Sequence, residues 1–298
     1  MIIAFMLPVN KKWVPPFIGL LMLYSIVYTV RNKYWHFSKK NAVMLIPLFL
    51  YLALLATFPL AVHAETAVSE LEYKLSMILF PLLTWMMPSF ERDQIRKMVD
   101  AFVMGCVVFL LFSTGYGIYR VNTLGSAEYL TYSNLGLIYH PTYMALYQSI
   151  TLSVLLLRGM RSSFFFRSKW LHWMLISVVM FYIVLLASKA GFITAVLAIA
   201  WAAIEAKRRG IMMRHLATVS LAAVLVFVGM IMVTPAAFSR IEESTKEITT
   251  QTTPTHEAWS STELRKVTWR SSIELMNDSW YGSGVGETTE RLIGIYLE

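Results

Sequence analysis

Two cations are the clearest candidates for chemistry in this sequence. Lys189 lies in a tight connection between two long apolar runs, and Arg265 lies in a later polar segment. Either cation can balance the charge of a phosphate, Arg as a bidentate fork and Lys as a point charge. Each also has an ordinary alternative role. A Lys at a membrane edge extends its ammonium group to water, and an Arg on a solvated helix face pairs with a nearby Glu.

Aromatic and polar side chains near these cations are candidates for substrate binding. His140 and Tyr143 lie at the start of an apolar run, where Pro141 suits the first helical turn. Aromatic side chains also gather at membrane–water boundaries without touching a substrate, so this reading stays open beside the first. Trp269 follows Arg265 by four residues and is expected to fix the direction of that side chain, one helical turn away.

Other kinds of site are excluded by number or spacing. No two of the six histidines have the i,i+4 spacing of a helical metal site, so no metal is expected. The only cysteine, Cys106, excludes an intrachain disulfide and a cysteine-based metal site. Gly282, Gly284 and Gly286 follow a predicted helix rather than a strand, which argues against dinucleotide binding. No cofactor is therefore expected.

The composition indicates a membrane protein. Hydrophobic residues make up 57% of the 298 residues and charged residues only 15%, which is too little polar surface to cover a soluble globule. The mean hydropathy is +0.56. The net charge of +8 does not indicate nucleic-acid binding, because the basic residues lie in short clusters between apolar runs. Contact with membrane lipids is expected instead.

The basic clusters predict the orientation of the chain. They lie within residues 31–40, 92–97, 158–169 and 207–214, and the connections between them carry almost no Lys or Arg. This alternation is the positive-inside pattern of a multi-pass membrane protein. The four basic connections are therefore predicted to be cytoplasmic, and the other connections are predicted to face the opposite side.

The apolar runs predict eight full spans and one partial helix, since about 20 apolar residues cross a bilayer. The partial helix is residues 2–9, read either as the outer end of an earlier helix or as a short interfacial segment. The predicted spans are residues 13–30, 41–64, 75–90, 101–119, 142–157, 170–188, 190–204 and 216–239. The expected fold is all-α, with a transmembrane helical bundle over residues 1–234 and a periplasmic helical loop over residues 235–298.

The loop contains a predicted helix from Glu263 to about Asn277, with Thr262 as its cap. Its apolar stripe is too broad for a free solvated helix, so docking over the outer ends of the spans is expected. The stripe consists of Leu264, Val267, Trp269, Ile273 and Leu275. Docking would bring Arg265 close to Lys189, and two cations so near each other repel unless an anion lies between them. The pair therefore predicts a shared phosphate.

Three segments, in this order and on the predicted outer side, resemble bacterial O-antigen ligase family proteins. These are membrane glycosyltransferases that share a domain with O-antigen polymerases. Residues 139–143 (YHPTY) resemble the start of a span in some members, and residues 185–191 (LLASKAG) resemble the family's Ser-Arg/Lys-x-Gly turn. Arg265 and Trp269, followed by residues 282–286 (GSGVG), resemble its Arg-x3-Trp helix and Gly-x-Gly turn. Lys189 stands where many relatives have Arg.

The resemblance implies transfer of a glycan from undecaprenyl pyrophosphate to an acceptor hydroxyl, often on the lipid A core. The reaction would take place at the periplasmic face of the bacterial inner membrane. Lys189 and Arg265 would be the catalytic cations that stabilise the developing diphosphate charge, with His140, Tyr143 and Trp269 contacting the substrate. Family members continue to a His that acts as general base and to further spans, so a C-terminally incomplete chain that lacks this His is expected.

Two alternatives stay open. A polymerase of the same family uses the same lipid-linked donor and differs only in the acceptor glycan. A non-enzymatic membrane transporter would place ionisable residues at mid-span. The nearest examples, Asp100 and Glu205, lie at predicted cytoplasmic ends, which favours chemistry at the outer surface.

Overall fold

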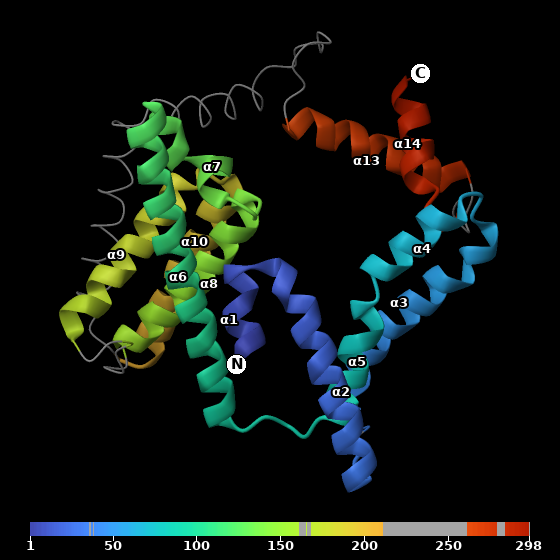
Figure 1. Ribbon diagram of the computed structural model, residues 1–298, viewed down its shortest axis with the longest axis horizontal. Coiled ribbons are helices and arrows are strands. Elements are labelled where there is room, and N and C mark those ends of the chain that lie inside the picture. Colours follow the sequence, from blue (N-terminus) through green and yellow to red (C-terminus); the bar gives the residue numbers. More distant parts are fainter. Residues whose placement is uncertain are drawn as a thin grey trace. The chain divides into compact units, whose positions relative to one another are not determined.

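The computed structural model describes residues 1–35, 37, 39–160, 165, 168–210, 261–278 and 284–297. All regular structure in these residues is helical, as predicted (Figure 1). The chain forms two compact units. One comprises Met1–Ile18 with Glu91–Lys246, and the other comprises Gly19–Phe90 with Glu247–Glu298. The predicted division after residue 234 falls outside the described residues and stays a prediction.

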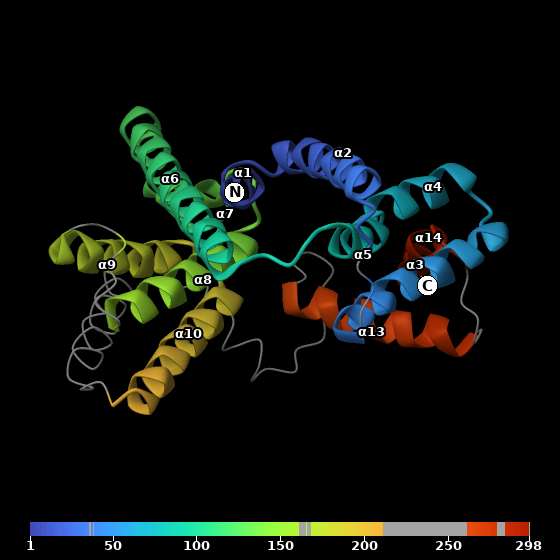
Figure 2. The ribbon, with the colours of Figure 1, turned by 90° about the horizontal axis from the view of Figure 1, so that it is seen from below.

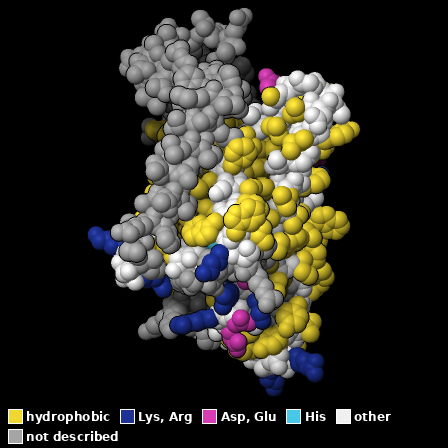
Figure 3. Space-filling model, turned by 90° about the vertical axis from the view of Figure 1, so that its left-hand side faces the viewer, with side chains coloured by type: hydrophobic (Ala, Val, Ile, Leu, Met, Phe, Trp, Pro, Cys, Tyr) yellow, Lys and Arg dark blue, Asp and Glu magenta, His cyan; other side chains and the backbone are white. Residues whose placement is uncertain are grey.

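Four helical stretches in the described part of the chain are long and apolar enough to cross a membrane. They are Lys11–Asn32, Ala42–Leu60, Arg92–Leu124 and Ala190–Arg208. Figure 3 shows hydrophobic side chains covering much of one face, with Lys and Arg gathered toward its lower end. Many large hydrophobic side chains are exposed, among them Leu23, Val27, Phe49, Leu111 and Val196, as expected of helices that face lipid. By helix length and hydropathy, the chain is therefore a candidate multi-pass membrane protein.

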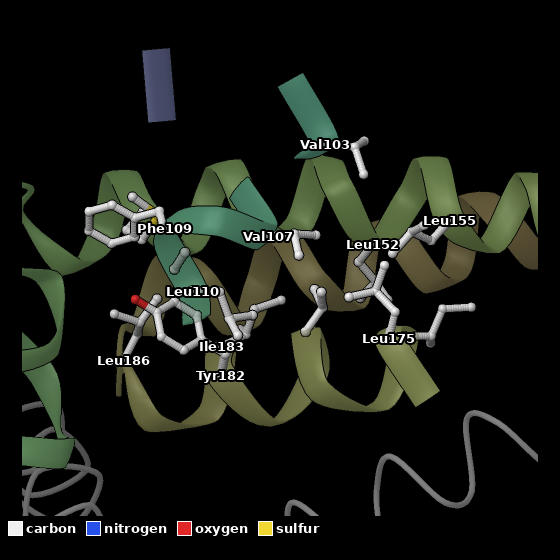
Figure 4. Close-up of a cluster of buried hydrophobic side chains, with 14 of the residues drawn as sticks. Val103, Val107, Phe109, Leu110, Leu152, Leu155, Leu175, Tyr182, Ile183 and Leu186 are labelled. Carbon is white, nitrogen blue, oxygen red and sulfur yellow. The ribbon is translucent and has the colours of Figure 1, made fainter. Parts of the chain in front are cut away.

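The first unit is built around a long helix, α6 (Arg92–Leu124), with Glu91 and Gln94 forming a capping box at its start. The other helices wholly in this unit are α1 (Ile2–Val9), η1 (Lys11–Trp13), η4 (Ala127–Leu130), α7 (Tyr132–Gly136), α8 (Pro141–Met160), α9 (Lys169–Leu185) and α10 (Lys189–Arg208). Helix α8 packs against both α9 and α10 (Figures 1 and 2). The core lies between α6, α8 and α9, where the labelled side chains point toward one another (Figure 4).

Small residues let these helices approach closely. A Cβ atom added to Gly105 of α6 would lie 2.3 Å from the carbonyl oxygen of Phe5 in α1. One added to Gly191 of α10 would lie 2.5 Å from the Cβ of Ala145 in α8. Helices in a bilayer associate through such contacts, because lipid removes the hydrophobic drive between them. The two glycines are therefore packing positions.

The second unit contains α3 (Leu45–Ala56), flanked by η2 (Lys39–Met44) and η3 (Phe58–Leu60), then α4 (Ala64–Tyr73) and α5 (Ser76–Met86). Its C-terminal helices are α13 (Ser261–Asp278) and α14 (Thr288–Leu297). Helix α2 (Val14–Asn32) begins in the first unit and continues in the second. A small buried cluster joins Tyr51, Ala67, Leu71 and Val285.

Some predicted spans differ from the observed helices. The span expected at residues 75–90 is a helix of only 11 residues, α5, which ends when Met87 turns extended. Pro88 follows Met87 and disfavours helical geometry in the residue before it. Helix α8 has 20 residues but is not among the four membrane-length apolar stretches, and α9 is a shorter apolar helix. The span expected at residues 216–239 lies outside the described residues.

The loop helix is observed close to its predicted bounds. Helix α13 covers Ser261–Asp278, against the predicted Glu263 to Asn277. Because the helix begins at Ser261, Thr262 lies inside its first turn instead of capping it.

Candidate functional site

Only three residues connect α9 to α10, and they form a strained turn. Leu186 is the C-cap of α9, Ala187 has a φ of +44°, and Ser188 is extended. A positive φ is unfavourable for a residue with a Cβ atom and is maintained only where surrounding contacts require it. Ser188 caps α10, since its Oγ accepts a hydrogen bond from the N–H of Gly191 at 3.3 Å. Lys189 is thus the first residue of α10.

This turn is fastened to the start of α8. Ser188 Oγ donates a hydrogen bond to Thr142 Oγ1 at 3.2 Å. One turn further on, Gly191 packs directly against Ala145. These contacts fix the backbone of Lys189 beside the first two turns of α8. The Lys189 side chain lies outside the described residues.

His140 and Tyr143 lie at the same end of α8. His140 Nδ1 accepts a hydrogen bond from the N–H of Thr142 at 3.3 Å, and both predicted side chains are exposed, Tyr143 to 61%. The His140 ring meets Tyr143 and Tyr132 edge to face, with centroids 6.3 and 6.4 Å apart. The first unit therefore brings an exposed aromatic cluster and the backbone of Lys189 together at one end of two packed helices.

Arg265 and Trp269 lie on α13, in the other unit. The Arg265 side chain lies outside the described residues, and the Trp269 side chain is 69% exposed. Because Arg265 and Lys189 belong to different units, their predicted proximity stays a prediction.

Within its own unit, α13 buries only one side. Ser271 is buried, and Val267 and Leu275 are half-buried, four residues to either side of it. Trp269 and Ile273, which belong to the predicted apolar stripe, are exposed. At 100° per residue, a position two residues from Ser271 points to the opposite side of the helix. Trp269 therefore makes no packing contact on the Ser271 side of α13, and its predicted docking over the spans of the other unit stays a prediction.

A second site, absent from the sequence analysis, lies where the C-terminal segment meets the hairpin of α3 and α4. Gly284 and Gly286 have φ values of +94° and +91°, and both backbones touch the hairpin. An added Cβ would lie 3.0 Å from the Leu60 oxygen at Gly284 and 2.8 Å from the Ala67 nitrogen at Gly286. Between the two glycines, Val285 is buried. This segment cannot pack so closely with larger residues at the glycine positions.

Glu287 completes the contact. Its Oε1 accepts hydrogen bonds from the N–H groups of Val62 and His63, at 2.7 and 2.9 Å. These hydrogen bonds stabilise the ionised carboxylate and so lower the pKa of Glu287, with the bond from the His63 amide making the largest contribution. His63 Nδ1 lies 3.5 Å from Glu287 Oε2 and 3.2 Å from Glu290 Oε2. The ligand atoms of these three residues lie within 4.8 Å of one another, so they could hold a metal ion.

A groove of about 440 Å³ runs between α8 and α10. Its lining is mainly apolar and includes Leu146, Ile150, Leu197 and Trp201.

No protein-family model, no curated protein and no solved structure matches this chain. Its function must therefore be argued from the residues and their geometry.

The second site does not show in the sequence, because its ligands are one histidine and two distant carboxylates rather than two histidines spaced along one helix. His63 and Glu287 are 224 residues apart in the chain. The one local signal was the spacing of Glu287 and Glu290, three residues apart at the start of a helix.

Proposed function

We propose that this chain is a membrane glycosyltransferase of the O-antigen ligase type. It moves a glycan from undecaprenyl pyrophosphate to an acceptor hydroxyl, such as one on the lipid A core, at the periplasmic face of the inner membrane. The main support is the position of Lys189 as the first residue of α10. The alternative of a polymerase uses the same donor and the same cations.

The start of α10 suits a lipid diphosphate. The first N–H groups of a helix have no partner within it, and the helix dipole adds partial positive charge at that end. The backbone N–H groups at the start of α10 and the ammonium group of Lys189 would together stabilise the negative charge that develops as the bond between the glycan and the diphosphate breaks. By the family resemblance, Arg265 is a second candidate cation for a diphosphate.

The aromatic cluster supports a glycan ligand at the same end. His140 and Tyr143 present ring faces and edges to the surroundings, so they are proposed to contact the sugar nearest the diphosphate. Trp269, which is 69% exposed, is available for the same role on α13. The groove between α8 and α10 lies further along these two helices. Its apolar lining suits the polyprenyl chain of the donor.

A transporter is the less supported alternative. Conduction through the bundle would require charged side chains buried at mid-span. Within the described membrane-spanning helices, no Asp, Glu, Lys or Arg is buried. The ion pair between Arg158 and Asp100 joins α8 and α6 at the end predicted to be cytoplasmic.

The deciding experiment measures glycan transfer by the full-length gene product in membranes. Lys189→Ala is expected to lower transfer about 100-fold or more, the usual cost of removing one group that stabilises transition-state charge. Lys189→Arg should retain part of the activity. Lys169→Ala is the matched control, because Lys169 also begins an apolar helix but at the opposite, predicted cytoplasmic, end.

Two outcomes would contradict the proposal. Wild-type transfer by the Lys189→Ala variant would leave Lys189 as an anchor of the turn. Equal losses in the Lys189→Ala and Lys169→Ala variants, with equal membrane insertion, would indicate a general effect on the helices. Supplying donor without a lipid A core separates ligase from polymerase, because only a polymerase then extends the glycan.

A further inference from the structure

The cluster of His63, Glu287 and Glu290 has no part in the proposed transfer reaction. We propose that these three side chains bind one divalent transition-metal ion, with Zn²⁺ the best fit. The ion would fasten the C-terminal segment to the hairpin of α3 and α4. This proposal stands whether or not the chain transfers glycans.

The spacing of the donor atoms suits such an ion. Tetrahedral Zn²⁺ holds nitrogen and oxygen ligands at about 2.0 Å, so adjacent ligand atoms lie about 3.3 Å apart. His63 Nδ1 lies 3.2 Å from Glu290 Oε2 and 3.5 Å from Glu287 Oε2. The cluster therefore needs little movement to surround a metal ion.

Glu287 is held in the manner of a metal ligand. Its side chain is only 6% exposed, and Oε1 is occupied by the Val62 and His63 amides. Oε2 is thereby turned toward His63 Nδ1. Hydrogen bonds of this kind orient a ligating carboxylate, and they keep it ionised, as metal binding requires.

Charge and ligand type favour a divalent transition metal. With neutral imidazole, the cluster carries two negative charges in a small volume, which a divalent ion would neutralise. Imidazole suits Zn²⁺, whereas Mg²⁺ and Ca²⁺ prefer oxygen ligands. His63 and Glu290 side chains are 52% and 55% exposed, so water can complete the coordination shell. The competing arrangement is protonated His63 paired with both carboxylates, without metal.

The backbone around the cluster is already fixed, which reduces the cost of assembling the site. His63 is the N-cap of α4, and Glu290 lies in the first turn of α14. Gly284 and Gly286 pack the segment before α14 against the hairpin of α3 and α4, through contacts that involve no metal. An ion would therefore join the starts of α4 and α14, beside a segment that packing already holds on the hairpin.

The test uses the full-length protein in detergent micelles, stripped of metal with a chelator and then titrated with Zn²⁺. Bound zinc is counted by mass spectrometry after gel filtration, and the affinity is measured by competition with a chromogenic chelator. The variants are His63→Asn and Glu290→Gln. The matched control is Glu65→Gln, an exposed acidic residue in the first turn of α4 and outside the cluster.

Wild type and Glu65→Gln are expected to bind about one zinc ion per chain. His63→Asn and Glu290→Gln should bind at least about 10-fold more weakly. The proposal is overturned if wild type takes up no zinc, which is the result expected of a protonated His63 pair. It is also overturned if all four proteins bind zinc equally. Should His63→Asn fail to fold, Glu290→Gln decides, because that side chain is half exposed.

Discussion

Gly286→Ala should release the C-terminal segment from the hairpin of α3 and α4. A residue with a Cβ atom at a φ of +91° is strained by about 1–3 kcal/mol. The new Cβ would also lie 2.8 Å from the Ala67 nitrogen, a backbone atom that cannot move aside as a side chain can. At about 1.4 kcal/mol per factor of ten, strain alone weakens docking by up to about 100-fold. The overlap with Ala67 adds to that.

Hydrogen exchange reports this release directly. The amides of Val62 and His63 donate to Glu287 only while the segment is docked, so their exchange should become faster in the Gly286→Ala variant. Gly294→Ala is the control, because nothing lies within 4 Å of a Cβ added there, in the exposed part of α14. It should leave exchange unchanged, or slow it slightly through higher helix propensity. Unchanged protection of both amides in Gly286→Ala would refute the docking geometry.

Two further predictions concern the first unit and the topology. Gly191→Ala should destabilise the pair α8–α10 by about 1–3 kcal/mol, the usual cost of overpacking. Thermal unfolding in detergent measures this loss of stability. Ala145→Gly in the same chain should restore stability, since the clash is with the Ala145 methyl group. If this second substitution does not restore it, the strain lies elsewhere. Reporter fusions at Arg96 and Arg209 should give a cytoplasmic signal, and fusions at Ala67 and Asn122 a periplasmic one. A periplasmic signal at Arg209 would reverse the predicted orientation.

The apolar runs predicted some helices to within a few residues at each end. The run at residues 190–204 became α10, and the run at residues 13–30 became α2. Helix α4 was not expected, because Glu65, Glu70 and Glu72 make its sequence polar. Ala67 and Leu71, four residues apart, supply the narrow apolar face that it buries. Such a face is too small to stand out from a count of hydrophobic residues.

Contacts between distant segments could not be predicted in this way. Val285 packs with residues of α3 and α4, and Glu287 accepts a hydrogen bond from Val62, all more than 200 positions earlier in the chain. The sequence showed glycines near the C-terminal helices but not which backbone they approach. The residue type also does not tell which side of α13 packs within its own unit, since the angular position of Trp269 places it away from the buried Ser271.

Some residues at the turn between α9 and α10 have a structural role, and one does not. Ser188 caps α10, and Gly191 is required by the contact with Ala145. Neither role explains a cation at position 189, since the helix dipole disfavours positive charge at a helix start by about 0.3–1 kcal/mol. Lys169 begins α9 in the same way, but on a connection predicted to be cytoplasmic, where basic residues set orientation. Lys189 has no such topological reason. A bound anion would reverse the electrostatic cost at this position, and this is the strongest reason to look for a phosphate there.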